Sequence, residues 1–253
     1  MFLGRFRSKT QEDFFGFIEG DQVIRVNSKE RYPLSELKIL PPTVATKIIG
    51  IGLNYRDHAK ELGMEIPKEP LFFFKPPSAV IAHLEEIVLP IQSREVHYEG
   101  ELAIVIGKRI HKPKNINEIK EAILGYTCFN DVTARDLQKK DIQWTRSKSF
   151  DTFAPVGPFI RVDIKEPGHW KIETLVNGEV KQSSYTSELI FHPFELVKFL
   201  ANIMTLNPGD IIATGTPPGV GKLKDGDVVE VKIETIGSLI NKVVSETGEK
   251  TWN

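Results

Sequence analysis

The chain has 253 residues, enough to bury one large core or a main domain with a small appendage. Its hydrophobic fraction of 40%, charged fraction of 26% and net charge of −1 favour neither nucleic acid nor a membrane surface as a partner. The single cysteine, Cys128, excludes an internal disulfide and a cysteine-rich zinc site. We find no membrane-spanning segment and no secretory signal in the sequence, so we expect a cytoplasmic protein.

The first part of the chain, residues 1–45, is expected to form a small β-rich domain, followed by a larger domain over residues 46–253. Two short apolar runs, 14–18 and 22–26, flank a Glu-Gly-Asp turn, which is a hairpin signal. The paired prolines in 40–43 stiffen the chain and predict a linker between the two domains.

Residues 47–52 predict a buried strand that opens the larger domain. Its Gly-Ile-Gly lacks the third glycine of a dinucleotide-binding fingerprint and no βαβ alternation follows, so we reject that fingerprint and rank an NAD-dependent enzyme a distant third among the alternatives. A short helix is expected next, with Asn54 as its N-cap. On that helix His58 and Glu61 are spaced i and i+3 and share one face. They form either an oriented general base or an ordinary exposed ion pair.

The run 71–75 predicts an aromatic strand closed by prolines. Its three consecutive phenylalanines are more typical of a core than of a binding surface. Lys75 is expected to lie at the surface with its ammonium group in water, and the alternative is that it faces an anion. Cys128, within the apolar run 125–130, is expected to be a buried and inert thiol.

Three carboxylates stand where buried strands begin or end. Glu99 and Glu101 stand just before the apolar run 102–106. Side chains two residues apart on a strand point to the same face. Asp131 follows the run 125–130 directly. Three oxygen ligands without a histidine or cysteine cluster suit a hard divalent ion, Mg²⁺ first and then Mn²⁺ or Ca²⁺. For the two glutamates alone, the alternative is a solvated strand end.

Basic and amide side chains follow Asp131. Thr133 with Asp136 resembles a capping box and predicts a helix over 134–138. Arg135 and Gln138 share one face of that helix, and Lys148 adds a further cation nearby in the sequence.

The C-terminal third contains two hairpin signals and one amphipathic helix. Asn177-Gly178 is the strongest short turn dipeptide, and residues 193–203 carry apolar side chains at helical spacing. A buried strand from 211 ends in the loop Thr214-Gly215-Thr216. Such a loop exposes backbone N–H groups and hydroxyls to a carboxylate or phosphate, or is a plain tight turn. Strand 228–234 and a return strand close the chain.

Six motifs taken together resemble the fumarylacetoacetate hydrolase family. They keep that family's order and spacing over roughly residues 47–245, and the first 45 residues resemble the small β-rich extension of many bacterial members. The motifs are Gly-Leu-Asn-Tyr-x-x-His (52–58), Phe-x-Lys-Pro (from 73), His-Tyr-Glu-Gly-Glu-Leu (97–102), Asn-Asp-Val-Thr-Ala-Arg-Asp (130–136), Lys-Ser-Phe-Asp (148–151) and Thr-Gly-Thr-Pro-x-Gly-Val-Gly (214–221).

The resemblance implies a mainly β fold with few helices, sometimes called a mixed β-sandwich roll, and a homodimer. It also implies that one Mg²⁺ or Mn²⁺ is held by Glu99, Glu101 and Asp131. His58 and Glu61 match a dyad on a mobile lid helix that activates water in the hydrolytic members.

The resemblance further implies how a substrate is held. Lys148 looks like the family's active-site lysine, and Arg135 and Gln138 match positions that face the substrate. The loop Thr214-Gly215-Thr216 looks like the one that holds the substrate's carboxylate.

From this resemblance we expect divalent-metal-dependent hydrolysis of a C–C bond in a 2,4-diketo acid of the acylpyruvate or fumarylpyruvate type, through a metal-bound enolate, as in the catabolism of aromatic compounds. The alternatives on the same site are isomerisation of 5-carboxymethyl-2-hydroxymuconate or 2-hydroxyhepta-2,4-diene-1,7-dioate, and decarboxylation or tautomerisation of oxaloacetate-like acids. The alternative from another class is a catalytically silent metal-binding homologue, and the retained dyad and Lys148 argue against it.

Overall fold

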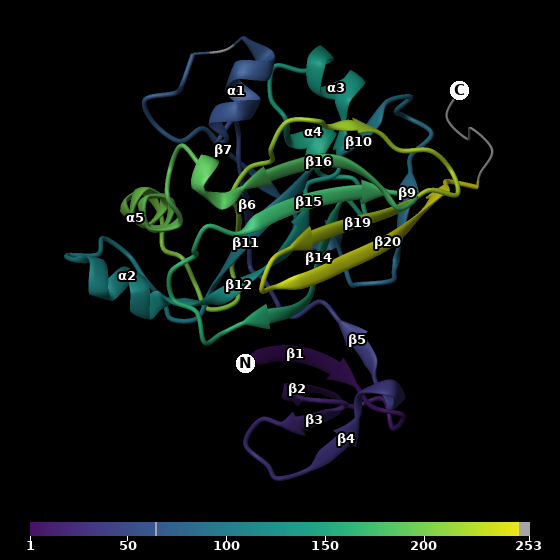
Figure 1. The fold of residues 1–253 in the computed structure, drawn as a ribbon, viewed down its shortest axis with the longest axis vertical. Coiled ribbons are helices and arrows are strands. Elements are labelled where there is room, and N and C mark those ends of the chain that lie inside the picture. The colour runs from purple at the N-terminus through teal and green to yellow at the C-terminus, as the bar shows by residue number, and fades with distance from the viewer. Residues whose placement is uncertain (64, 248–253) are drawn as a thin grey trace.

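The computed structural model describes residues 1–63 and 65–247 and is predominantly β, as expected (Figure 1). Its strands form sheets of twelve, five and three members. The twelve-stranded sheet runs β4-β3-β2-β1-β14-β12-β11-β17-β6-β7, and β5 and β8 pair with β1 and β14. Its members are β1 (Phe2–Arg7), β2 (Asp13–Glu19), β3 (Gln22–Arg25), β4 (Arg31–Pro33), β5 (Lys38–Leu40), β6 (Ile48–Ile51), β7 (Phe72–Lys75), β8 (Val80–Ile81), β11 (Gly100–Ile106), β12 (Ile123–Asn130), β14 (Ala154–Arg161) and β17 (Ile211–Ala213).

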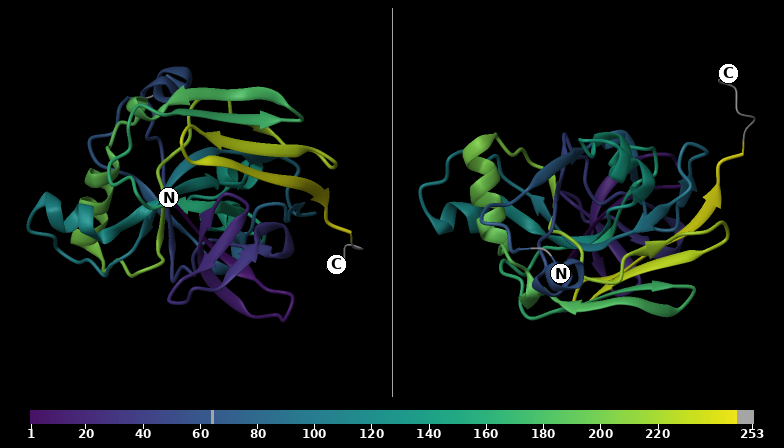
Figure 2. Two further views of the ribbon diagram at one scale, coloured as in Figure 1. Left: turned by 60° about the horizontal axis from the view of Figure 1, so that its bottom comes forward. Right: turned by 90° about the horizontal axis from the view of Figure 1, so that it is seen from above.

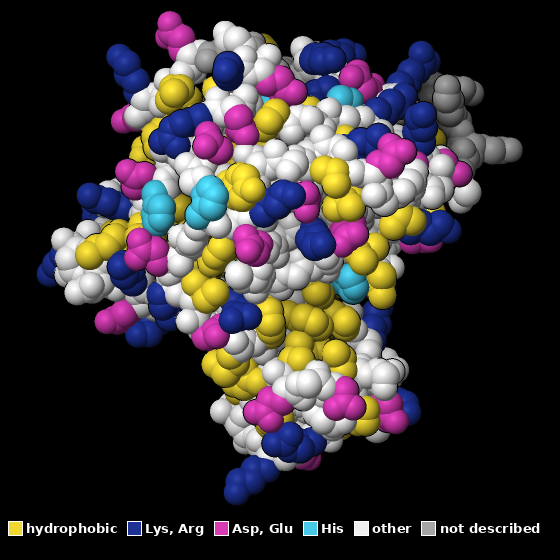
Figure 3. Space-filling view, in the orientation of Figure 1, with side chains coloured by type: hydrophobic (Ala, Val, Ile, Leu, Met, Phe, Trp, Pro, Cys, Tyr) yellow, Lys and Arg dark blue, Asp and Glu magenta, His cyan; other side chains and the backbone are white. Residues whose placement is uncertain are grey.

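The N-terminal strands form the lower unit of Figure 1, with a small core of their own around Phe6, Phe14 and Val23. The predicted hairpin is confirmed, because β2 and β3 pair antiparallel around the Glu-Gly-Asp turn. Strand β1 also pairs with β14, so the unit is joined to the large sheet by backbone hydrogen bonds. Figure 3 shows hydrophobic side chains gathered where this unit meets the rest of the chain. A domain boundary at residue 45 stays a prediction.

The five-stranded sheet packs against the middle of the large one (Figure 2). One buried cluster joins Leu102 and Ile104 of β11 to Ile172 of β15 and Val231 of β19. The sheet order is β16-β15-β19-β20-β9, and the three-stranded sheet runs β13-β10-β18. The bounds are β9 (Glu86–Leu89), β15 (Lys171–Val176), β16 (Glu179–Tyr185), β19 (Val228–Ile233), β20 (Gly237–Ser245), β10 (Val96–Tyr98), β13 (Thr133–Ala134) and β18 (Gly221–Lys222).

The helices are short and lie around the edges of the sheets (Figure 1). The predicted amphipathic helix is confirmed as α5, which buries Leu196 and Leu200 and begins at a capping box made by His192 and Glu195. No helix among the described residues is long and apolar enough to cross a membrane. The helices are α1 (Arg56–Leu62), α2 (Ile116–Ala122), α3 (Arg135–Lys140), α4 (Thr145–Lys148) and α5 (Pro193–Ile203), with 3₁₀ turns at Leu34–Glu36, Pro77–Ala79 and Thr186–Glu188.

Two predicted helix caps are wrong. Helix α1 begins after Tyr55, and the Asn54 amide instead donates to the carbonyl oxygens of Phe191 and Thr214. Thr133 lies in strand β13 and donates its hydroxyl to the Asp131 carbonyl, while α3 starts without a side-chain cap. Asn54 therefore bonds to distant segments, whereas Thr133 bonds to a carbonyl two residues before it, and neither side chain caps a helix.

Two predictions for the aromatic strand, β7, are corrected by the structure. Lys75 is not a surface residue, because only 1% of it is exposed. The phenylalanines are also not all in the core, since Phe74 is 44% exposed. Phe72 packs against the main core cluster, so the exposure is greatest at Phe74 in this edge strand of the large sheet. The prediction for Cys128 is confirmed: the thiol is buried, and burial raises its pKa to about 12.

Candidate active site

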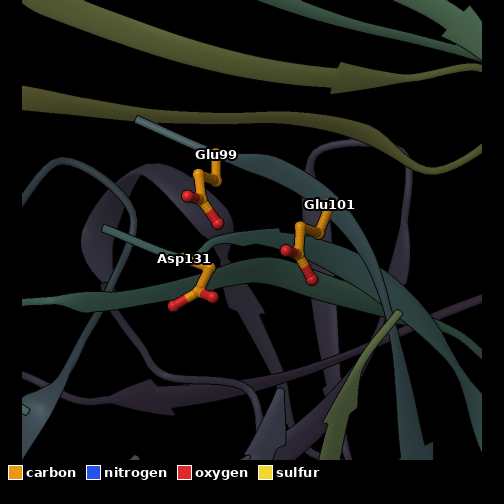
Figure 4. Close-up of side chains that lie close together, drawn as sticks. All are labelled: Glu99, Glu101 and Asp131. Atoms are coloured by element: carbon orange, nitrogen blue, oxygen red, sulfur yellow. The ribbon is translucent and has the colours of Figure 1, made fainter. Parts of the chain in front are cut away.

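The three predicted metal ligands meet in the structure (Figure 4). Strands β11 and β12 pair antiparallel with Gly100 opposite Asn130, which places the start of one strand beside the end of the other. Glu99, Glu101 and Asp131 are all buried, and each offers an oxygen within 4.8 Å of the others. Three carboxylates from two neighbouring strands therefore converge on one point.

The glycine between the two glutamates is required by the packing of the sheets. A Cβ at Gly100 would lie 2.0 Å from the Thr174 hydroxyl oxygen and 3.3 Å from a methyl group of Val231. These two residues belong to β15 and β19 of the facing sheet, so only glycine lets the sheets approach this closely.

Glu99 is surrounded by positive charge. One of its oxygens accepts a hydrogen bond from the Arg135 guanidinium, and the other accepts one from the Lys148 ammonium at 2.9 Å. Burial alone would raise the pKa of Glu99, but Lys148 and Arg135 outweigh it and hold that pKa well below its ordinary value. Lys148 also contacts Asp131 at 2.6 Å, and the two carboxylates together raise the pKa of the lysine against the effect of burial.

Lys75 also belongs to the site, although its ammonium group was expected to lie in water. Its ammonium donates to one Asp131 oxygen at 2.5 Å and to the Val132 carbonyl at 3.1 Å. The other Asp131 oxygen is held by Lys148, so both oxygens of this carboxylate contact a cation. Burial lowers the pKa of Lys75, and the Asp131 charge only partly opposes that effect.

Glu101 lies in a different environment, because it takes its hydrogen bond from the Gly215 backbone at 2.8 Å rather than from a basic side chain. Burial, followed by the negative charges of Asp131 and Glu99, raises the pKa of Glu101 well above its ordinary value. Gly215 has a φ of +98°, and a Cβ there would lie 2.8 Å from Asn54, so this turn needs glycine.

The residues of the cluster fit a divalent metal ion. All three offer carboxylate oxygens, the ligands that Mg²⁺, Mn²⁺ and Ca²⁺ prefer. The charge of Lys148 only partly offsets the effects that raise the pKa of Glu101, and a bound divalent ion would supply further positive charge. The ligand set does not by itself select one metal among the three.

His58 and Glu61 form the predicted pair on α1. The Nδ1 atom of His58 lies 2.8 Å from a Glu61 oxygen, and a second Glu61 oxygen accepts the Gly219 N–H at 3.3 Å. Because a carboxylate only accepts, the neutral imidazole carries its proton on Nδ1, and its Nε2 accepts no hydrogen bond from the residues that the structure describes. The imidazole is 11% exposed and the carboxylate 44%, so the histidine faces inward and its partner faces solvent.

A cavity of about 250 Å³ brings most of these residues together. Gln138 lines it and accepts a hydrogen bond from Arg135, so the predicted shared face of α3 is observed. An aromatic wall was not foreseen: the rings of Phe73 and Trp144 pack edge-on, with centroids 5.5 Å apart. The lining residues are Ile51, Gly52, Leu53, His58, Leu71, Phe73, Glu99, Glu101, Arg135, Gln138, Trp144, Lys148 and Thr216.

The loop Thr214-Gly215-Thr216 supports the strand that carries the acidic cluster more than it lines the cavity. The Thr214 hydroxyl donates to the Leu102 carbonyl at 2.9 Å, and the Thr216 hydroxyl donates to the Gly100 carbonyl at the same distance. A hydroxyl has one proton, so neither is left to donate to a substrate carboxylate. Among the described residues of this loop, Thr216 lines the cavity, whereas Thr214 and Gly215 hold β11 in place.

The structure thus places a buried acidic triad that could hold a metal ion, two buried lysines and an oriented histidine on a mainly β scaffold. The sequence model described as fumarylacetoacetate (FAA) hydrolase C-terminal matches residues 47–244. The chain therefore belongs to the fumarylacetoacetate hydrolase family, whose members are enzymes.

Relatives that share this scaffold bear the names of different reactions. A structure of 5-carboxymethyl-2-hydroxymuconate delta-isomerase from Mycobacterium smegmatis is 43% identical, with 98% of this chain and 100% of that chain covered and a TM-score of 0.91. Oxaloacetate tautomerase FAHD2A, mitochondrial, from Bos taurus is 44% identical over 84% of this chain and 71% of its own. Maleylpyruvate hydrolase from Sphingobium sp. SYK-6, solved with manganese(II) and pyruvate, is 29% identical, with 98% and 100% coverage and a TM-score of 0.82.

Proposed function

We propose that this chain is a divalent-metal-dependent enzyme that moves a proton at the carbon beside the keto group of a small 2-keto dicarboxylic acid, as in keto–enol tautomerisation of oxaloacetate. The observation that carries the proposal is the imidazole of His58, oriented by Glu61 at the cavity that Glu99 and Glu101 of the acidic triad also line. The relatives named for tautomerisation and isomerisation, at 44% and 43% identity, support it over hydrolysis, because two structures named as hydrolases are 33% and 29% identical.

His58 and Glu61 have separate roles in the proton transfer. His58 takes the proton from C3 of the keto acid, and the C–H electron pair moves to give an enolate with its charge on the C2 oxygen. Glu61 holds the imidazole in one orientation and compensates its charge while it carries the proton. The proton then passes to the C2 oxygen, which completes the enol without any other reactant.

The buried cations stabilise the negative charge that develops on the C2 oxygen. Lys148 stays protonated beside Glu99 and Asp131 and provides a fixed positive charge in the cavity wall. Such prepositioned charges are typically worth about 3–4 kcal/mol per donor in the transition state. A metal ion held by Glu99, Glu101 and Asp131 would act as a Lewis acid toward the keto oxygen.

Hydrolysis of a 2,4-diketo acid is the second candidate, and the solvent-exposed position of Glu61 favours it. Water reaching the dyad would give its proton to His58 Nε2 and attack the distal carbonyl. The C–C bond then breaks, the released carbon takes up a proton, and the products are pyruvate and a carboxylic acid.

One pair of assays separates the two reactions. Enol-oxaloacetate is followed with malate dehydrogenase and NADH, which consume only the keto form, and acetylpyruvate is followed with lactate dehydrogenase, which detects pyruvate. Each assay is run with Mg²⁺, with Mn²⁺ and after EDTA treatment. Metal-dependent acceleration of the first establishes tautomerisation, and metal-dependent pyruvate release in the second establishes hydrolysis. If protein that binds Mn²⁺ gives no signal in either assay, both reactions are refuted and the catalytically silent homologue is favoured.

We also propose that the chain acts as a homodimer whose small-molecule partner is the 2-keto acid, as family membership suggests. Light scattering coupled to size-exclusion chromatography tests the dimer, and a mass of 28.6 kDa would contradict it.

A further inference from the structure

A closed ring of hydrogen bonds encloses the Gly100 peptide between the two glutamates. The Gly100 N–H donates to Oε1 of Gln182 at 3.0 Å, and Nε2 of Gln182 donates to the Thr216 hydroxyl oxygen at 2.8 Å. That hydroxyl in turn donates to the Gly100 carbonyl at 2.9 Å, which closes the ring. Gln182 donates a third bond, to the Pro217 carbonyl at 2.8 Å. The ring joins β11, β16 and the loop after β17.

We propose that Gln182 is a positioning residue that fixes the Gly100 peptide and thereby directs Glu99 and Glu101 toward the metal. The inference rests on the metal site of the proposed function. Sheet packing requires glycine at position 100, and glycine is the residue whose backbone is least restricted by its own side chain. The directions in which the two flanking glutamates leave the backbone must therefore be fixed by contacts from outside.

Two further hydrogen bonds hold the backbone of Glu99, next to Gly100. The Glu99 N–H donates to the Asn130 side-chain oxygen at 3.0 Å, and the Glu99 carbonyl accepts the Asp131 N–H at 2.8 Å. These bonds tie Glu99 to the strand that carries the third ligand. Gln182 provides the matching restraint from the facing sheet, and it is only 1% exposed, so water does not compete for its bonds.

A purely structural role for Gln182 makes a different prediction from a positioning role. A buried amide that merely satisfies its neighbours would, when removed, lower stability and leave metal affinity unchanged. Asn241 offers the matched control, because it is also 1% exposed and its amide donates to the carbonyls of Ala82 and Glu85 at 2.9 and 2.8 Å. It lies on β20, whereas the ring joins β11 and β16.

The test measures Mn²⁺ affinity by electron paramagnetic resonance, without substrate, in Gln182→Leu, Asn241→Leu and the natural protein. Thermal unfolding is recorded for each variant. We expect Gln182→Leu to weaken Mn²⁺ binding by about 10–100-fold, the usual effect of losing a group that orients a ligand, and Asn241→Leu to leave it unchanged. If Gln182→Leu does not fold, Thr216→Val breaks the ring in a side chain of similar shape and should weaken binding, and Thr216→Ser should restore it.

The failures of the two proposals are distinguishable. A natural protein that binds no Mn²⁺ would overturn the metal site on which both depend. Tight binding by the natural protein together with unchanged affinity in Gln182→Leu, or in Thr216→Val, would overturn only the role of Gln182.

Discussion

Replacing Lys75 with methionine tests whether the buried lysine holds Asp131. The change removes the 2.5 Å contact to Asp131 and leaves the Val132 carbonyl without its partner. Removing one member of a buried ion pair costs about 3–5 kcal/mol, because the other charge remains in a medium that solvates it poorly. Since Asp131 keeps its contact with Lys148, we expect a loss near the lower end, about 3 kcal/mol. For a chain of this size that corresponds to a fall of about 6–12 °C in Tm.

The assay is thermal and urea unfolding of metal-free protein, repeated with excess Mn²⁺. Lys108→Met is the control, because Lys108 and its partner Glu121 are each 68% exposed and the change should stay within about 0.5 kcal/mol. A metal ion bound at Asp131 would offset part of the lost charge, so Mn²⁺ should stabilise Lys75→Met more than it stabilises the natural protein. A Tm for Lys75→Met equal to that of Lys108→Met would refute the reasoning.

Three further changes probe the site. Glu101→Gln should weaken Mn²⁺ binding strongly while circular dichroism shows an intact fold, and unchanged affinity by titration calorimetry would sink the ligand assignment. His58→Ala should keep its Mn²⁺ and lose about 10²–10⁴-fold in turnover, the contribution of a general base, so a fully active variant would remove the dyad from the mechanism. Gly100→Ala places a methyl group 2.0 Å from the Thr174 hydroxyl, and a Tm matching that of the natural protein would contradict the close approach of the sheets.

The acidic cluster was predictable because its parts are encoded locally. Glu99 and Glu101 share a face through the two-residue period of a strand, and His58 and Glu61 share one through the turn of a helix. Asp131 was predicted as the third ligand from its place at the end of an apolar run, and the antiparallel pairing of β11 and β12 is the physical cause of its convergence on the two glutamates.

The sequence also determined the regular elements with strong local signals. Helix α5 spans 193–203 as its periodicity indicates, and the hairpin of β15 and β16 turns at Asn177-Gly178. In each of these, the residues that decide the structure lie within a few positions of one another.

Only the tertiary structure decided which polar residues would be buried. Lys75 lies 56 residues from Asp131, and Gln182 lies 82 residues from Gly100, so nothing near either residue in the sequence marks its partner. The same holds for Asn54, whose amide bonds to segments far along the chain instead of capping its own helix. Desolvation is the physical reason: a lysine or glutamine is stable in the core only when packed sheets bring it the charge or hydrogen-bond partners that replace water.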